Sequence, residues 1–167
     1  MTLAEAAAHA DELATSGAEQ ELAALRGEWD DELEAAARSS DFRERAVAFR
    51  AVGLFRWRAK EELLRRGLDD GSPAARGSAL LSVELLSRDH PSTVNSVRPL
   101  LHKLVADAEE NAAVRRLAAI AMRNGSPQRE TIVLLEGLGG DDGADAELRR
   151  AAGGVAQALK RKAQERR

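Results

Sequence analysis

Residues 69–79 read DDGSPAARGSA, a turn followed by the beginning of a helix. Ser72 can accept hydrogen bonds from the free amides of a helix N-terminus. Pro73 suits the first helical position, because its missing amide would have no helical partner there. Arg76 follows Ser72 by four residues, and Ala79 follows Arg76 by three, which is helical spacing. The stretch therefore predicts a helix that begins at Pro73.

The same spacing of a capping residue, an arginine and an alanine recurs along the chain. The four sets are Asp41, Arg45 and Ala48; Ser72, Arg76 and Ala79; Asn111, Arg115 and Ala118; and Asp145, Arg149 and Ala152. Successive arginines are about 31, 39 and 34 residues apart. Periods of this size are typical of stacked helical pairs, and alternating β-branched runs are nearly absent. We expect an all-α protein, a right-handed α-solenoid (α-α superhelix) of about four antiparallel helical pairs.

Two capping boxes are expected near the N-terminus. Thr2 with Glu5, and Ser16 with Glu19, have the spacing in which each side chain bonds to a free amide of the helix start. These pairs predict one helix over about 3–14 and a second from 17 to about 38. The two helices form an expected hairpin.

Two prolines mark helix boundaries in the second half of the chain. Pro99 either begins its helix or kinks it, because proline lacks the amide that a helix interior requires. Ser126 and Pro127 resemble the pair at residues 72 and 73, and they predict a cap followed by the first residue of another helix.

Charge divides the chain into three expected parts within one domain. Residues 1–40 form an acidic helical hairpin, interpreted as a degenerate repeat that caps the array. Residues 41–159 hold the repeats, and residues 160–167 form a basic tail. The net charge is about −9 over residues 1–41, about +5 over 42–66 and about +4 over 160–167. These segments could attract each other, a partner or a neighbouring copy.

Residue types argue against several functions. The chain has no cysteine, which excludes disulfides, thiolate metal sites and cysteine nucleophiles. His9, His90 and His102 lack metal-ligand spacing, and the acids of residues 139–145 lack EF-hand spacing. There is no run of eighteen apolar residues and no secretory signal pattern. We expect a non-enzymatic, cytoplasmic protein with no metal, no cofactor and no membrane partner.

The units resemble HEAT repeats, particularly the short variety also called phycobilisome-lyase-type HEAT-like repeats. The resemblance covers residues 41–159 and is carried by these positions: Ala51, Val52, Gly53, Ala59, Leu63, Leu64, Leu68, Asp70, Arg76 and Ala79, and less completely Asp107, Arg115 and Ala118. It implies a structural ladder of acid and arginine along the stack, which would involve Asp70 with Arg45, Arg76, Arg115 and Arg149. Lyase activity is suggested by the family name alone, and so few aromatic residues are poorly suited to enclosing a tetrapyrrole.

The resemblance implies a protein-binding surface on the second helix of each pair. Aligning the leucines of those helices places Glu61 with Arg98, Arg65 with His102, and Arg66 with Lys103 in exposed columns. Such a mixed-charge stripe suits an acidic or mixed-charge segment of another protein. We therefore expect an adaptor or regulatory subunit.

Two alternatives remain open. The first is nucleic-acid binding by segment 43–66, where arginines surround Phe55 and Trp57. Within this segment Arg56, Trp57 and Arg58 lie at an expected turn between helices and are also candidate partner-binding residues. The acidic pI of 5.7 opposes this interpretation. The second is self-assembly, in which the acidic hairpin contacts a neighbour's basic segment or C-terminus to form a homo-oligomer.

Overall fold

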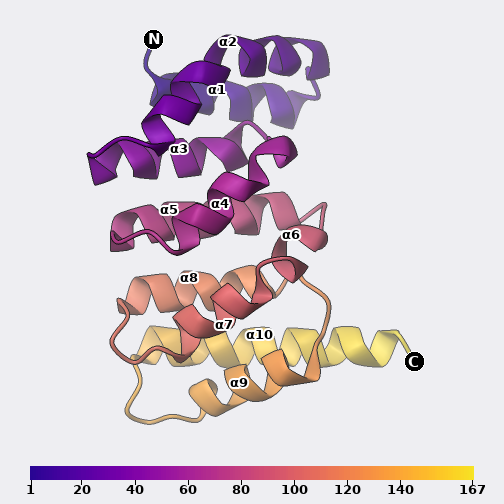
Figure 1. Ribbon diagram of the computed structural model, residues 1–167. Coiled ribbons are helices and arrows are strands. Elements are labelled where there is room, and N and C mark those ends of the chain that lie inside the picture. The colour runs from indigo at the N-terminus through magenta and orange to yellow at the C-terminus, as the bar shows by residue number, and fades with distance from the viewer. The chain divides into compact units, whose positions relative to one another are not determined.

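The computed structural model describes residues 1–167 and consists of helices and turns, without strands (Figure 1). The ten α-helices are α1 Leu3–Ser16, α2 Glu19–Ala37, α3 Phe42–Leu54, α4 Glu61–Leu68, α5 Pro73–Ser87, α6 Ser92–Asn95, α7 Arg98–Ala106, α8 Ala112–Met122, α9 Arg129–Gly139 and α10 Ala146–Glu165. A short 3-10 helix, Arg58–Lys60, precedes α4. The prediction of an all-α protein is confirmed, and the solenoid arrangement stays a prediction.

The chain divides into two compact units, Met1–Leu86 and Ser87–Arg167. In the first unit α1, α2 and α3 pack against one another, and α4 packs against α3. In the second unit α8 packs against both α7 and α10, and α9 packs against α10, as the lower part of Figure 1 shows. The predicted boundaries after residues 40 and 159, and the single domain, stay predictions.

Most of the predicted helix caps are present. Thr2 and Glu5 form a full capping box: the Thr2 amide donates to the Glu5 carboxylate at 2.7 Å, and the Glu5 amide donates to the Thr2 hydroxyl at 3.2 Å. Asp41, Asn111 and Asp145 each accept hydrogen bonds from the first turn of the helix that follows. The repeated capping positions therefore mark helix starts.

Two predicted starts were wrong. Ser16 belongs to the end of α1, where its hydroxyl donates to the Leu13 carbonyl; Gly17, with φ of 76°, then ends the helix. Ser126 does not cap α9, which begins at Arg129. Pro99, by contrast, lies in the first turn of α7, so it begins that helix without kinking it.

The first unit contains an unusually close approach between α3 and α5. The Gly53 amide donates to the Ser82 hydroxyl at 3.0 Å, and that hydroxyl donates to the Phe49 carbonyl at 2.5 Å. A Cβ atom on Gly53 would lie 2.7 Å from the Cα atom of Ser82. The absence of a side chain at residue 53 is therefore what allows the two helices to meet.

Each unit has its own apolar core. The largest fully buried side chains are Leu22, Leu33, Val52, Phe55, Leu64, Leu80 and Val83 in the first unit, and Leu101, Met122, Leu135, Leu148 and Leu159 in the second. Leucine and alanine dominate both cores, as the low aromatic content requires. None of the helices combines the length and the hydrophobicity needed to cross a bilayer.

Candidate functional site

An open apolar groove, here called the α1–α3 groove, lies between α1 and α3 of the first unit. Its wide hollow, of about 650 Å³, is lined by Thr2, Leu3, Ala4, Glu32, Ala35, Ala36, Arg43, Glu44 and Val47. Its narrow hollow, of about 260 Å³, is lined by Ala4, Ala7, Ala46, Val47, Arg50, Ala51, Leu54 and Ser78. Ala4 and Val47 line both hollows, so the two are parts of one groove.

The groove exists because short side chains from three helices face it. Ala4 and Ala7 come from α1, Ala46 and Ala51 from α3, and the end of α2 adds further alanines. Packed helix axes lie about 8–10 Å apart, and methyl groups fill little of the space above the seam between two such helices. The wall of the groove is therefore mostly apolar, and its depth comes from alanine.

One of the exposed large hydrophobic residues lines the wide hollow, and two others adjoin its lining residues in the sequence. The chain has five such residues: Met1, Phe42, Val47, Leu81 and Val133. Val47, 36% exposed, lines the hollow, and Met1 and Phe42 immediately precede the lining residues Thr2 and Arg43. Exposed apolar side chains that line a hollow are typical of interaction sites.

Acidic side chains border the wide hollow. Glu32 from α2 and Glu44 from α3 line it, and neither forms an ion pair. Arg43 also lines it, but its Nε atom lies 3.2 Å from the Asp41 carboxylate. The wide end of the α1–α3 groove therefore carries excess negative charge.

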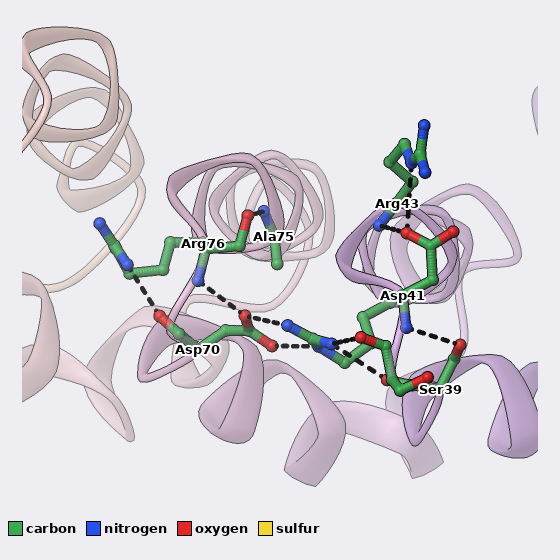
Figure 2. A network of polar contacts seen from close by, with 9 residues as sticks. Ser39, Asp41, Arg43, Asp70, Ala75 and Arg76 are labelled. Carbon is green, nitrogen blue, oxygen red and sulfur yellow. Dashed lines mark hydrogen bonds and ion pairs between the residues drawn. The ribbon is translucent and has the colours of Figure 1, made fainter.

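A polar network fixes the position of α3 relative to the turn before α5. Figure 2 shows the Asp70 carboxylate near its centre, with Arg76 on one side and Ser39 and Asp41 on the other. Arg45 donates to both Asp70 oxygens, at 2.8 and 3.0 Å, and to the Ser39 carbonyl at 3.0 Å. Arg76 donates to the Asp70 backbone carbonyl at 2.8 Å.

These hydrogen bonds change the acidity of Asp70. The Arg45 guanidinium holds the pKa of this carboxyl below its ordinary value, and the Ser72 amide, which donates to it at 2.9 Å, shifts the pKa in the same direction. Burial opposes both effects. The carboxylate is therefore the favoured form, and through Arg45 it joins α3 to the turn before α5.

In the second unit the corresponding arginines have other partners. Arg115 donates from Nε to the Val105 carbonyl at 3.0 Å, and Arg149 pairs with Asp142 at 3.2 Å. Arg45 therefore donates to the Asp70 side chain, whereas Arg115 and Arg149 bond to groups of the second unit. The structural role that the resemblance assigns to the whole set stays a prediction.

The basic segment 43–66 contacts the acidic hairpin of its own unit. Arg56 pairs with Asp11 at 2.8 Å, and Lys60 pairs with Asp30 and Glu34, each at 2.6 Å. Of the three attractions that the charge distribution allowed, the one within the chain is therefore present.

The Arg56–Arg58 turn is built into the same contact. Arg26 of α2 donates to the carbonyls of Phe55 and Arg56, at 2.9 and 3.0 Å. The Trp57 ring packs at 5.7 Å from the Phe55 ring, and the Lys60 ammonium lies 5.1 Å from the Trp57 ring centre. Trp57 is thus half-buried, while Arg58 is exposed and lies 3.7 Å from Glu61.

The remaining predicted partner-binding residues lie on α4 and α7. Glu61, Arg65 and Arg66 belong to α4 in the first unit, and the two arginines are exposed. Arg98, His102 and Lys103 belong to α7 in the second unit, where Lys103 is exposed. Their alignment into common columns stays a prediction.

Two of the α7 residues have internal partners. Arg98 donates to Asn95 at 2.6 Å and to the Ser126 carbonyl at 3.0 Å. His102 Nε2 lies 2.7 Å from the hydroxyl of buried Thr131. Burial lowers the pKa of His102; the neighbouring Glu130 raises it and Arg98 lowers it. His102 therefore favours its neutral form.

The groove residues were missed in the sequence. Ala4, Ala35 and Ala36 carry no chemical signal, because alanine is common on every helix face. Val47 carries a weak signal, because it is an apolar residue next to the inward-facing Ala48 and Phe49 but is not itself on the inward face of the helix. No cluster of three or more histidine or acidic side chains is placed to hold a metal ion.

Comparison with known proteins finds no counterpart: no family model, no curated protein and no solved structure matches the chain.

Proposed function

We propose that the protein is a non-enzymatic protein-binding module, an adaptor or regulatory subunit, and that the α1–α3 groove receives a segment of its partner. One observation carries the proposal: the groove is open and alanine-walled, and exposed Val47 lines both of its hollows. A partner that covers exposed apolar side chains stabilises the complex by about 25 cal/mol per Å² of buried apolar surface.

The dimensions of the groove suit a helix. Its lining follows α3 from Arg43 to Leu54, which corresponds to about 16 Å at 1.5 Å per residue. A docked helix with apolar anchors at positions i, i+3 or i+4, and i+7 needs about 10 Å for those anchors. The groove therefore offers room for two turns of anchors and for one flanking turn.

Ion pairs weigh against the nucleic-acid alternative. Six of the eight basic side chains in segment 43–66 lie in ion pairs with acids of the chain: Arg43, Arg45, Arg56, Arg58, Lys60 and Arg65. Phosphate contacts would have to compete with these carboxylates. Trp57, the aromatic residue available for base stacking, already packs on Phe55.

The finer architecture is also a proposal. We propose that the helical pairs belong to a right-handed solenoid similar to HEAT repeats. The repeated capping positions and the contacts between consecutive helices within each unit support this. Small-angle X-ray scattering tests it. A compact globule of 167 residues would have a radius of gyration of about 15 Å. A solenoid is longer, so a value at or below that figure would contradict the proposal.

Peptide display tests the binding function. A library of 20-residue peptides is selected on the wild-type protein, and each enriched peptide is then measured against Val47→Gln and Val133→Gln. Both residues are exposed valines on helices, and residue 133 lies outside the groove, on α9. Losing one buried valine contact should weaken binding about tenfold in the first variant, while the second should bind like wild type.

Two outcomes would refute the groove as the binding site. One is the absence of any enriched peptide. The other is a set of peptides that bind Val47→Gln and Val133→Gln equally well. Ala4→Gln, which puts a long side chain on the shared wall of both hollows, provides a second test, with exposed Ala8→Gln on the same helix as its control.

A further inference from the structure

We infer that the segment received by the α1–α3 groove is a cationic amphipathic helix, with large aliphatic side chains on one face and lysine or arginine at the end that covers the wide hollow. This inference rests on the proposed function and names the chemistry of the partner.

The charge of the partner follows from the rim of the wide hollow. Glu32 and Glu44 line that hollow and form no ion pair, whereas the single lining cation there, Arg43, is already paired with Asp41. The lining of the wide hollow therefore holds two carboxylates without an ion pair and one guanidinium that is paired with Asp41. A second arginine, Arg50, lines the narrow hollow, about 10 Å further along α3. Partner cations are thus favoured at one end of the docked helix.

The surroundings reinforce this polarity. Asp31 and Glu28 on α2 are exposed, and residues 1–41 carry a net charge of about −9. Lys60 and Arg56 compensate part of that charge, but they contact Asp11, Asp30 and Glu34, which do not line the groove. An acidic field of this kind speeds the approach of cationic segments and disfavours anionic ones.

The apolar requirement follows from the groove wall. Alanine side chains allow a docked backbone to approach closely, but they leave the hollow unfilled. The partner must supply the missing volume, because unfilled space forfeits dispersion contacts. Leucine, isoleucine, methionine or phenylalanine at helical spacing would fill it and would contact Val47, which lines both hollows.

A second copy of this chain fits less well. Of its two cationic segments, residues 42–66 already contact the acidic hairpin of their own unit through Arg56 and Lys60. The other, residues 160–167, reads KRKAQERR and holds no large apolar residue to enter the hollow. The last leucine of that helix, Leu159, is fully buried in the second unit. The basic end would match the charge of the rim but not the apolar wall.

Three synthetic 16-residue peptides test the inference. They share leucines at helical spacing and differ at one terminal turn, which holds lysine, glutamine or glutamate. Fluorescence anisotropy measures their affinity for the wild-type protein. The lysine peptide should bind at least tenfold more tightly than the glutamate peptide at low ionic strength, and the difference should shrink as salt screens the charges.

Matched variants locate the charge effect. Glu32→Gln with Glu44→Gln should weaken the lysine peptide by about three- to tenfold, as expected for two solvated charge contacts. The control, Glu12→Gln with Glu21→Gln, removes the same net charge from exposed positions outside the groove and should leave affinity unchanged. Equal losses in both double variants would overturn the inference, because the attraction would then be nonspecific.

Failure of the inference is distinguishable from failure of the binding function. If the glutamine or glutamate peptide binds as tightly as the lysine peptide and Val47→Gln weakens both, the groove binds peptides but the cationic preference is refuted. If Val47→Gln changes no peptide affinity, both proposals fail. If light scattering shows a dimer that Val47→Gln dissociates, the occupant is a second copy and the inference is also refuted.

Discussion

Replacing Gly53 by alanine should destabilise the first unit strongly, although alanine is the better helix former. Gly53 is the next-to-last residue of α3, where it faces Ser82 of α5. The added Cβ would lie 2.6 Å from the Ser82 hydroxyl and 2.7 Å from its Cα atom. Carbon atoms in favourable contact are about 3.5–4.0 Å apart. The two helices would therefore have to separate by about 1 Å.

The expected loss combines two effects and is reduced by a third. Overpacking of a core usually costs about 1–3 kcal/mol. The separation also breaks the hydrogen bonds of the Ser82 hydroxyl, which is fully buried, at a cost of about 1–3 kcal/mol. Higher helix propensity returns about 1 kcal/mol. We expect a net decrease of about 3 kcal/mol in the free energy of unfolding.

Urea denaturation followed by tryptophan fluorescence measures this loss. Both tryptophans, Trp29 and Trp57, lie in the first unit, so their emission reports its unfolding. Gly27→Ala is the matched control: residue 27 lies inside α2, and a Cβ there meets no atom within 4 Å. The control should be stabilised by up to about 1 kcal/mol. If Gly53→Ala proved as stable as Gly27→Ala, the close approach of α3 and α5 would be wrong.

Three further substitutions test polar contacts. Asp70→Asn should lower the free energy of unfolding by about 1.5–3 kcal/mol at pH 7. Because Arg45 lowers the pKa of the folded Asp70 carboxyl, this stability difference should vanish as the pH falls below about 4. Acid-denaturation curves of the wild type and the variant would measure it. Lys60→Met should cost about 1 kcal/mol in low salt and less in 1 M salt, as urea titrations at the two salt concentrations would reveal; equal losses would exclude an electrostatic origin. Burial lowers the pKa of folded His102, so the second unit should lose stability as the pH falls below about 6.5; hydrogen exchange at pH 5 and 7.5 should show this loss in the wild type and a smaller one in His102→Gln.

Local sequence signals predicted helix starts well where the cap acts on its own helix. Asp41, Asn111 and Asp145 were identified because a cap needs one side chain and the amides two or three residues later. Ser126 has the same local appearance, yet its amide donates to the Asn95 side chain at 3.0 Å. Asn95 thus competes for the backbone of this segment, and the residues adjacent to Ser126 in the sequence give no sign of that competition.

The charge pattern predicted that the segments attract other groups, but it did not predict which groups they contact. The acidic residues 1–41 and the basic residues 42–66 had three possible partners, and packing places Asp11, Asp30 and Glu34 against Arg56 and Lys60. Long flexible side chains form such pairs wherever the backbone brings them within a few ångströms. Net charge alone therefore does not tell a binding surface from an internal contact.

By itself, the sequence determined that the chain is helical and where most helices begin, because hydrogen bonds within one turn depend on neighbouring residues. The tertiary structure decided the site. Ala4, Ala36 and Val47 belong to three different helices and form a groove only when α1, α2 and α3 pack together. A hollow is the space that side chains leave unfilled, and that space depends on every element around it.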